Sequence, residues 1–221
     1  MSKPKPRAAI NCAVPNWENI FSPETRAALH EILDFEEIVS PQPNDESFLR
    51  EHAGGAEVIL STWGAAPITA EVLERCPDLK LVVHGAGTVK PFATEALVEK
   101  EVPVCSAAHV NGQSVAEFCL GMILTSMRDV FRSNHRLHEH GPEMWNKQRE
   151  AFRGGYYHTR VGLVGFGVIS RYLMKLLQSF DFEVFIASGY YGPEQEREYG
   201  AKPASLEWIL ENCDVVSLHS A

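Results

Sequence analysis

Short apolar runs alternate with amphipathic stretches along the first half of the chain. The runs that have the character of buried strands occupy residues 8–14, 35–40, 56–60, 79–83 and 102–106. Apolar positions at helical spacing between them predict helices near residues 23–33, 45–53, 69–76 and 92–100. Continuous apolar strands that alternate with helices are typical of a parallel sheet covered on both faces. The pattern therefore predicts a small flavodoxin-like α/β domain of five such units over residues 1–108.

The second half of the chain follows a different pattern. One long helix is predicted from Gln113 to about Glu139, and the apolar residues almost all round its first half indicate burial between domains or subunits. A polar, glycine-containing connection follows. Strands are then predicted at residues 161–165, 183–187 and 214–218, with helices at about 167–180 and 205–212. This βαβαβ unit is half of a doubly wound (Rossmann) sheet, so we expect an incomplete nucleotide-binding domain over residues 109–221.

A glycine turn lies at the start of this unit, in the segment VGLVGFGVISRYL at residues 161–173. Gly165 permits a sharp turn after the strand, and Gly167 lets a pyrophosphate approach the main chain. The free N–H groups and the positive dipole at the helix start favour phosphate. Ser170 replaces the third glycine of the dinucleotide fingerprint, and its small size predicts a slightly wider helix–strand distance rather than a lost turn. Within the βαβ frame, the turn predicts a dinucleotide site.

The end of the second strand of this unit lacks the usual ribose partner. NAD-binding sites commonly carry Asp or Glu about 20 residues after the turn, whereas this chain has Ser188, 23 positions after Gly165. Asp181 and Glu183 precede the strand, and Arg197 is a distant candidate for a 2′-phosphate. The sequence therefore leaves NAD and NADP open, and it also leaves open that Ser188 is only a loop residue.

Composition and charge narrow the classes of function. The chain has 221 residues, 45% hydrophobic and 22% charged, which is ordinary for a soluble globular protein of two modest domains. No apolar run reaches the roughly 18 residues of a membrane span, and no signal peptide is evident, so we expect a cytoplasmic location. The net charge of −9 argues against nucleic-acid binding. The cysteines contain no C-x-x-C pair, and we expect these four to be small buried hydrophobes: Cys12, Cys105, Cys119 and Cys213.

Four landmarks occur in order along the chain: HGAG at 84–87, NGQSVAEFCLGMIL at 111–124, VGLVGFGVIS at 161–170 and CDVVSLHSA at 213–221. With these landmarks, the chain from residue 66 onward resembles the D-isomer-specific 2-hydroxyacid dehydrogenases, which include phosphoglycerate, glyoxylate and formate dehydrogenases. The resemblance implies an oxidoreductase that transfers hydride between NAD or NADP and the 2-carbon of a D-2-hydroxyacid or 2-ketoacid. It also implies a homodimer, with the long helix packed against the second subunit.

The resemblance implies roles for individual residues. It assigns the substrate carboxylate to a loop of small residues with free N–H groups, preceded by a histidine: His84, Gly85, Ala86 and Gly87. An ordinary strand-to-helix turn is the alternative reading of this loop. It assigns the cofactor to Gly165, Phe166, Gly167, Val168, Ile169, Ser188, Asn111, Ser114, Val115 and His219. Glu117 is expected to favour the dipole at the start of the long helix. Both histidines are also compatible with purely structural roles.

Several features depart from the family pattern. The chain has VKPF at 89–92 where an acidic turn is common, and Val168 where arginine is common. The family's catalytic arginine, glutamate and histidine have no counterpart within the sequence, so we expect them downstream and expect residues 1–221 alone to be inactive. No metal site is expected, because His135 and His138 fit a solvated helix end. We also expect the first strand of the cofactor sheet to lack its fourth-strand partner and to leave an apolar edge open.

Two other functions remain open at this point. One is a cofactor-binding regulatory protein on the same scaffold, which would bind the dinucleotide without turning over a substrate. The other is an inactive fragment of a longer enzyme. The presence or absence of the arginine, glutamate and histidine in a longer sequence would separate the first of these from an enzyme.

Overall fold

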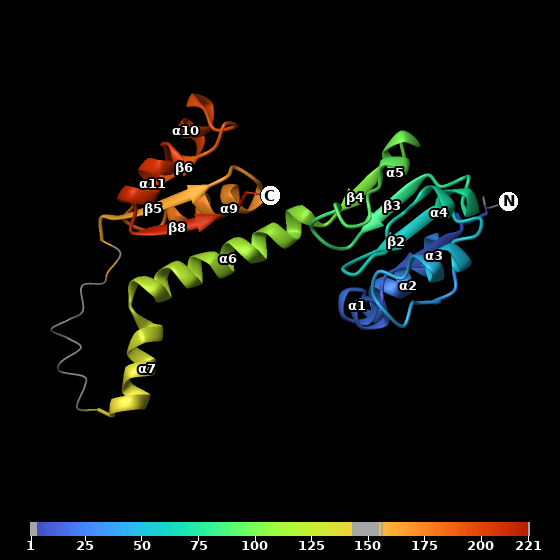
Figure 1. The fold of residues 1–221 in the computed structure, drawn as a ribbon, viewed down its shortest axis with the longest axis horizontal. Coiled ribbons are helices and arrows are strands. Elements are labelled where there is room, and N and C mark those ends of the chain that lie inside the picture. Colours follow the sequence, from blue (N-terminus) through green and yellow to red (C-terminus); the bar gives the residue numbers. More distant parts are fainter. Residues whose placement is uncertain (1–3, 143–154, 156, 221) are drawn as a thin grey trace. The chain divides into compact units, whose positions relative to one another are not determined.

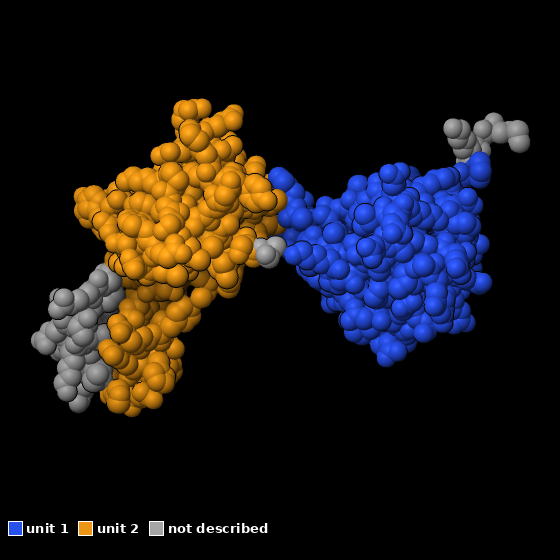
Figure 2. Space-filling model, turned by 45° about the horizontal axis from the view of Figure 1, so that its top comes forward, with its two compact units in different colours: residues 1–111 blue, residues 112–221 orange. Residues whose placement is uncertain are grey.

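The computed structural model of the protein describes residues 4–142, 155 and 157–220. Contacts within the chain divide it into two compact units, residues 1–111 and 112–221 (Figure 2). Each unit contains a parallel sheet with helices (Figure 1). The predicted α/β class is confirmed.

The first unit is built on a four-stranded sheet in the order β1-β2-β3-β4. Its strands are β1 (Ala8–Asn11), β2 (Val58–Ser61), β3 (Leu81–His84) and β4 (Val104–Ser106), and all neighbours are parallel. Its helices are α1 (Val14–Ile20), α2 (Pro23–Ile32), α3 (Glu46–His52), α4 (Ala70–Arg75) and α5 (Glu95–Glu99). Successive residues of β2, Ile59 and Leu60, are fully buried in two different apolar clusters. Because successive strand residues face opposite sides, both faces of this sheet are covered.

Residues 35–40 do not form the predicted fifth strand. Isolated parallel bridges occur only on either side of β1, from Arg7 to Asp34 just before the segment and from Ala13 to Ser40 at its end. The prediction rested on the apolar residues of the run FEEIVS, and it gave too little weight to the charged pair in the middle of that run.

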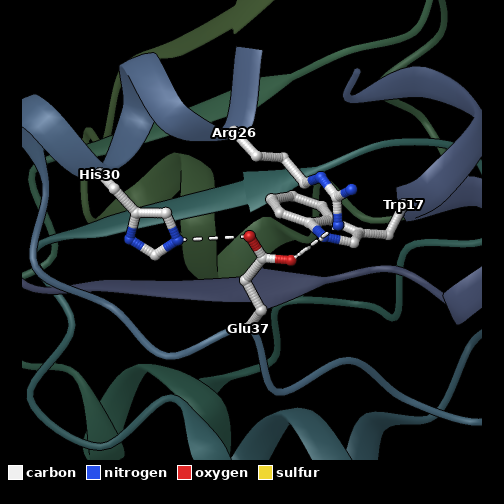
Figure 3. A network of polar contacts seen from close by, with 4 residues as sticks. All are labelled: Trp17, Arg26, His30 and Glu37. Atoms are coloured by element: carbon white, nitrogen blue, oxygen red, sulfur yellow. Dashed lines mark hydrogen bonds and ion pairs between the residues drawn. The ribbon is translucent and has the colours of Figure 1, made fainter. Parts of the chain in front are cut away.

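Glu37 connects this segment to two helices. Its carboxylate accepts hydrogen bonds from Trp17 Nε1 at 3.1 Å and from Arg26 at 2.9 Å, and it lies 3.2 Å from His30 Nε2 (Figure 3). Burial opposes ionisation of this carboxyl, but the three partners outweigh it and lower the pKa of Glu37. The segment is therefore held by helices α1 and α2 instead of by strand pairing.

The second unit contains the helices α7 (Val130–His140), α9 (Val168–Leu177), α10 (Pro193–Tyr199) and α11 (Leu206–Asn212). Its strands are β5 (Thr159–Val164), β6 (Phe182–Ala187), β7 (Lys202–Pro203) and β8 (Val215–Leu218). They form a parallel sheet in the order β7-β6-β5-β8. Most of the predicted connection at 141–160 lies outside the described residues.

The strand order corrects the expected edge of this sheet. We expected residues 214–218 to be the third strand and the first strand to lack its fourth-strand partner. In the structure β5 is paired on both sides, with β6 and with β8, and the two-residue β7 occupies the outer position beside β6. The prediction missed β7 and α10 because neither contains an apolar run, so its strand count was one short. Among the described residues, β7 and β8 are the two edge strands of this sheet, and Leu218 of β8 is 70% exposed.

The long helical stretch is two helices. It begins earlier than predicted, as α6 (Ala108–Met127), and α7 follows after a break at Asp129, whose φ of 56° no α-helix allows. Only one face of α6 is buried within the chain, since Ala116 is fully buried whereas Phe118 is 67% exposed. The cysteines also differ from the expectation: Cys12 is buried but Cys105 is exposed. Among the described residues, no helix combines the length and apolar character needed to cross a bilayer.

Candidate functional site

The glycine turn lies between β5 and α9, at the carboxyl end of β5. Gly165 has a φ of +98°, and its N–H donates to the carbonyl of Ala187 at the end of β6. A Cβ on Gly165 would lie 2.9 Å from backbone atoms of His219 and Ser220. Conformation and packing therefore both require glycine here. The turn is locked between the exits of two neighbouring strands.

Gly167 is different, because the described residues of the chain do not fill the space beside it. Its backbone is extended, with φ −90° and ψ −168°, and a Cβ there would have only the His219 carbonyl oxygen nearby, at 3.9 Å. The residue is the N-cap of α9, and no side chain caps that helix start. The first N–H groups of a helix have no intrahelical acceptor. The geometry thus leaves room and hydrogen-bond donors for an anion at the start of α9.

Ser170 closes the turn from the helix side. Its side chain is fully buried, and its hydroxyl donates a 2.7 Å hydrogen bond to the carbonyl of Gly165. The serine in place of the third glycine is thus compatible with the turn, and it adds a bond that a glycine could not make. Close helix–strand packing is found instead at Gly162, where a Cβ would lie 2.4 Å from Ile209 Cγ2 of α11.

The start of α9 is packed against α6. A Cβ on Gly112 would lie 2.7 Å from Val168 Cγ1 and 3.7 Å from Ile169 Cγ1. Val168 therefore fills a contact with α6. An arginine at this position would need another direction for its side chain.

Phe166 turns its ring into the unit, away from solvent. It is 9% exposed and meets Tyr191 and Tyr199 edge-on, at centroid distances of 5.1 and 5.6 Å. The guanidinium of Arg171 lies over the same ring at 4.3 Å. Arg171 is not among the site residues predicted from the sequence. The available signal was its place in the first turn of α9, where the helix dipole disfavours a cation.

His219 and Ser188 lie at the carboxyl ends of the strands that flank β5. The N–H of His219 donates to the Val164 carbonyl, and its ring pairs with the Ser217 hydroxyl at 2.9 Å. Burial lowers the pKa of His219 and favours the neutral ring. Ser188 is half-buried, and its hydroxyl accepts the N–H of Tyr190 at 3.2 Å. The second unit thus gathers Gly165, Gly167, Ser188 and His219 at one edge of its sheet, where α/β proteins bind ligands.

The predicted substrate loop lies in the first unit, directly after β3. The N–H of Gly85 already donates to the Ser61 carbonyl at 2.7 Å, so this group is not available for a substrate. Ala86 is buried, and its carbonyl accepts the N–H of Ala107 at 3.0 Å. Within residues 4–142 and 157–220, the N–H groups of Ala86 and Gly87 make no main-chain hydrogen bond. Two of the three expected donors are therefore not used by the described main chain, with Gly87 half-buried and Ala86 only 1% exposed.

His84 is directed into the first unit. It is 3% exposed, its Nδ1 pairs with the Ser61 hydroxyl at 2.9 Å, and its ring packs on Phe92 at 4.7 Å between centroids. Burial lowers its pKa, and the nearby backbone of Thr88 only partly opposes this shift. His84 therefore packs within the first unit, directly before the loop, through its contacts with Ser61 and Phe92.

The remaining predicted positions lie on α6. The amide nitrogen of Asn111 lies 3.3 Å from the position of a Cβ on Gly87, so the structure brings these two residues together. Ser114 is exposed and Val115 half-buried, in the second turn of the helix. The expected role of Glu117 is wrong: α6 begins at Ala108, so Glu117 lies far beyond the first turn, and it instead accepts a bond from Gln113.

No group of three histidine, cysteine or carboxylate side chains suited to a metal occurs within the part of the chain that the structure describes. His135 pairs with Glu139 at 3.3 Å on the exposed surface of α7. The chemistry offered by the two predicted sites is accordingly that of main-chain N–H groups and small residues. Such groups suit phosphate and carboxylate ligands.

Comparisons with known proteins agree with this geometry. Residues 120–221 match the family described as D-isomer specific 2-hydroxyacid dehydrogenase, NAD binding domain. A D-3-phosphoglycerate dehydrogenase of Haemophilus influenzae is 34% identical over 157 residues, covering 69% of this chain and 36% of its own. A putative 2-hydroxyacid dehydrogenase of Staphylococcus epidermidis is 24% identical over 172 residues, or 77% of this chain and 52% of its own. The chain therefore spans about half or less of the length of these relatives.

Solved structures give the same result for the fold. A phosphoglycerate oxidoreductase from Rhizobium etli is 26% identical, with a TM-score of 0.73 over 97% of this chain and 66% of its own. A protein from Pyrococcus horikoshii has a TM-score of 0.77 at 22% identity, over 98% of this chain and 62% of its own. The landmarks, the glycine turn and these matches lead to one conclusion: residues 120–221 form an NAD-binding domain of the D-isomer-specific 2-hydroxyacid dehydrogenase family.

Proposed function

We propose that the protein is an NAD(P)-dependent oxidoreductase that transfers hydride between the nicotinamide and the 2-carbon of a D-2-hydroxyacid or 2-ketoacid. The observation that carries this proposal is the contrast within the glycine turn. Gly165 is required by the fold itself, whereas the open space beside Gly167 is explained by a ligand that approaches the main chain there. The family match over residues 120–221 identifies that ligand class as a nicotinamide dinucleotide.

In this proposal each part of the turn has a distinct task. The N–H groups at the start of α9 bind the pyrophosphate, aided by the helix dipole. Ser170 and the exit of β8 hold Gly165 in its left-handed conformation, so the turn is preorganised before binding. His219 and Ser188 border the site at the ends of the neighbouring strands. When bound, the nicotinamide supplies the hydride chemistry.

On the substrate side, the free N–H groups of Ala86 and Gly87 would bind the substrate carboxylate, and Asn111 lies next to them. Small residues let an anion approach the main chain closely, which supports this assignment. We propose that proton transfer and the clamp on the carboxylate come from the family's histidine, glutamate and arginine, to which no residue of this sequence is matched. Residues 1–221 alone are accordingly expected to bind the cofactor without turnover.

The assembly and location of the protein are part of the same proposal. Exposed apolar side chains on α6, including Val110 and Phe118, support a role for this helix in a homodimer. The five free cysteines support a reducing, cytoplasmic location. A small 2-hydroxyacid or 2-ketoacid is the proposed substrate.

The test is a fluorescence titration of the 221-residue chain with NADH and, separately, with NADPH. The proposal expects saturable enhancement of the nicotinamide emission with at least one of them. Gly167→Val should abolish it, because the side chain would occupy the proposed pyrophosphate position. Gly121→Val is the matched control, since Gly121 lies on α6 with no atom within 4 Å of a Cβ. If a folded wild-type chain bound neither dinucleotide, or if Gly167→Val bound normally, the proposed site would be wrong.

A further inference from the structure

The carboxyl end of β6 has an unusual chemical character for a dinucleotide site. Residues 184–192, which form the end of this strand and its exit, contain no Asp or Glu. In NAD-binding sites of this type, a carboxylate here accepts hydrogen bonds from the ribose and repels a 2′-phosphate. Glu183, the nearest preceding acid, lies at the other end of β6 and pairs with Lys202 at 3.4 Å. Residues 184–192 themselves therefore contribute no carboxylate that would repel a phosphate.

Ser188 offers a hydrogen-bond donor at the position of that carboxylate. Its Oγ already accepts the N–H of Tyr190, which leaves the hydroxyl proton free to donate. The next residue, Gly189, is exposed and has no atom within 4 Å of a Cβ. Space and a donor are thus found together at the tip of the strand.

Arg171 supplies a cation on the same side of the unit. Its guanidinium stacks over Phe166, and the Phe166 ring also contacts Tyr191, three residues after Ser188. The side chain therefore lies over a ring of the glycine turn that also contacts Tyr191 and Tyr199, in the segment that follows β6. Arg171 lies in the first turn of α9, where the helix dipole disfavours a positive charge. A bound anion would offset this cost, and an arginine is the usual partner of a 2′-phosphate.

The acids of α10 are the competing influence. Glu194, Glu196 and Glu198 follow the exit of β6, and Glu198 lies close enough to Tyr199 to raise the pKa of that hydroxyl, in addition to the larger effect of burial. Glu194, in the first turn of α10, is the first acid that follows Ser188 in the sequence. An NAD-selective site would need one of these carboxylates, with Glu194 the first candidate, to bond the ribose.

We propose that this site prefers NADP(H) to NAD(H), with the Ser188 hydroxyl donating to the 2′-phosphate and Arg171 pairing with it. The inference rests on the proposed dinucleotide site and specifies which dinucleotide it takes. It assigns Ser188 and Arg171 as the residues that determine cofactor specificity.

The experiment compares dissociation constants of NADPH and NADH for the 221-residue chain, by nicotinamide fluorescence at low and at high salt. NADPH should bind more tightly, and its advantage should shrink with added salt because the contact to Arg171 is exposed. Arg171→Ala should weaken NADPH about tenfold, the usual scale of a charge-assisted hydrogen bond, and leave NADH within about twofold. Ser188→Asp should reverse the preference by adding the missing carboxylate.

Arg197→Ala and Glu194→Gln test the alternatives. Arg197 is an exposed arginine on α10, and its removal should leave both constants unchanged. The proposal is overturned if the wild-type chain binds NADH as tightly as NADPH or more tightly. It is also overturned if Glu194→Gln loses affinity for NADH. A loss of NADPH affinity in Arg197→Ala but not in Arg171→Ala would overturn it as well. These outcomes leave the dinucleotide site intact. Failure of the folded chain to bind either dinucleotide would instead remove the proposed function itself.

Discussion

The hydroxyl of Ser170, fully buried in α9, donates a 2.7 Å hydrogen bond to the carbonyl of Gly165 five residues before it. This bond ties the first turn of the helix to the left-handed residue that ends β5. Ser170→Ala leaves a buried carbonyl with one acceptor bond fewer, and it should destabilise the second unit by about 1–2 kcal/mol. Hydrogen exchange at the amides of β5, measured at increasing urea concentrations, gives the lost free energy of unfolding of the second unit.

The same substitution should affect cofactor binding only weakly if Ser170 acts through the turn. We expect a rise in the dissociation constant of about two- to threefold, within the range that small shifts of a preorganised site produce, and recovery in Ser170→Thr if the added methyl group can be accommodated. Ser47→Ala, at an exposed position of α3 in the first unit, is the control. An unchanged stability in Ser170→Ala would show that the bond contributes nothing to the turn.

Gly165 and Gly167 should respond to alanine in opposite ways. Gly165→Ala forces a left-handed residue against backbone atoms 2.9 Å away, so we expect the second unit to lose about 2–5 kcal/mol of stability. At Gly167 the backbone is extended, and an added Cβ would lie 3.9 Å from the His219 carbonyl oxygen. Gly167→Ala should therefore change the stability of the second unit by about 0.5 kcal/mol or less. Its affinity for the dinucleotide should nevertheless fall about tenfold or more, since loss of 1.4 kcal/mol of binding energy is tenfold.

Thermal unfolding and dinucleotide titration of both variants check this pair. Parallel behaviour, in which both variants lose stability or both keep their affinity, would contradict the assignment of one glycine to the fold and the other to the ligand.

The contact between Gly112 and Val168 predicts an energetic coupling. Gly112→Ala would place a methyl group 2.7 Å from Val168 Cγ1, at a cost of about 1–3 kcal/mol, which the better helix propensity of alanine offsets by at most about 1 kcal/mol. Val168→Ala removes the opposing methyls. The double variant should therefore be more stable than the sum of the single effects by about 1–2 kcal/mol. A double-mutant cycle in urea gives this value directly, and additive effects would mean that α6 and α9 do not pack closely here.

The sequence predicts those parts of this structure that depend on local patterns. Four of the five predicted strands of the first unit and the strand–turn–helix around Gly165 follow from apolar periodicity and from the requirement for glycine at positive φ. Residues 35–40 had a suitable composition for a strand, but Glu37 takes partners from Trp17 and Arg26, which are close only after folding. Such tertiary contacts override a local preference.

The site shows the same division. The turn at Gly165 and Gly167 was predictable because each step of the motif has a backbone reason. The position of Arg171 over Phe166 was not predictable, because it depends on how three aromatic rings pack around the turn. The hydrogen bond from the Gly85 N–H to the Ser61 carbonyl was not predictable either, because Ser61 lies on β2, which is next to β3 only in the folded sheet.

Buried His84 makes the stability of the first unit depend on pH. Burial favours the neutral ring, so the folded-state pKa of His84 lies below its ordinary value of 6.5. As the pH falls, the unfolded chain takes up this proton first, and stability is lost from about pH 6.5 downward until the folded-state pKa is passed. Glu37, whose pKa is also lowered, acts in the same direction but at lower pH: its contribution to stability is present above its ordinary value of 4.5 and is lost only below it. The interval between about pH 4.5 and 6.5 therefore isolates the histidine.

Hydrogen exchange at the amides of Val82 and Val83, in the strand that carries His84, measures the opening free energy of the first unit across this interval. We expect it to fall between pH 6.5 and 5 in the wild-type chain and to stay nearly constant in His84→Gln, whose neutral amide can still bond the Ser61 hydroxyl. His52→Gln, on the surface helix α3, should keep the wild-type profile and serves as the control. The same slope in His84→Gln as in the wild-type chain would assign the pH dependence to other groups. It would also mean that protonation of the His84 ring, below the predicted substrate loop, does not reduce the stability of the first unit.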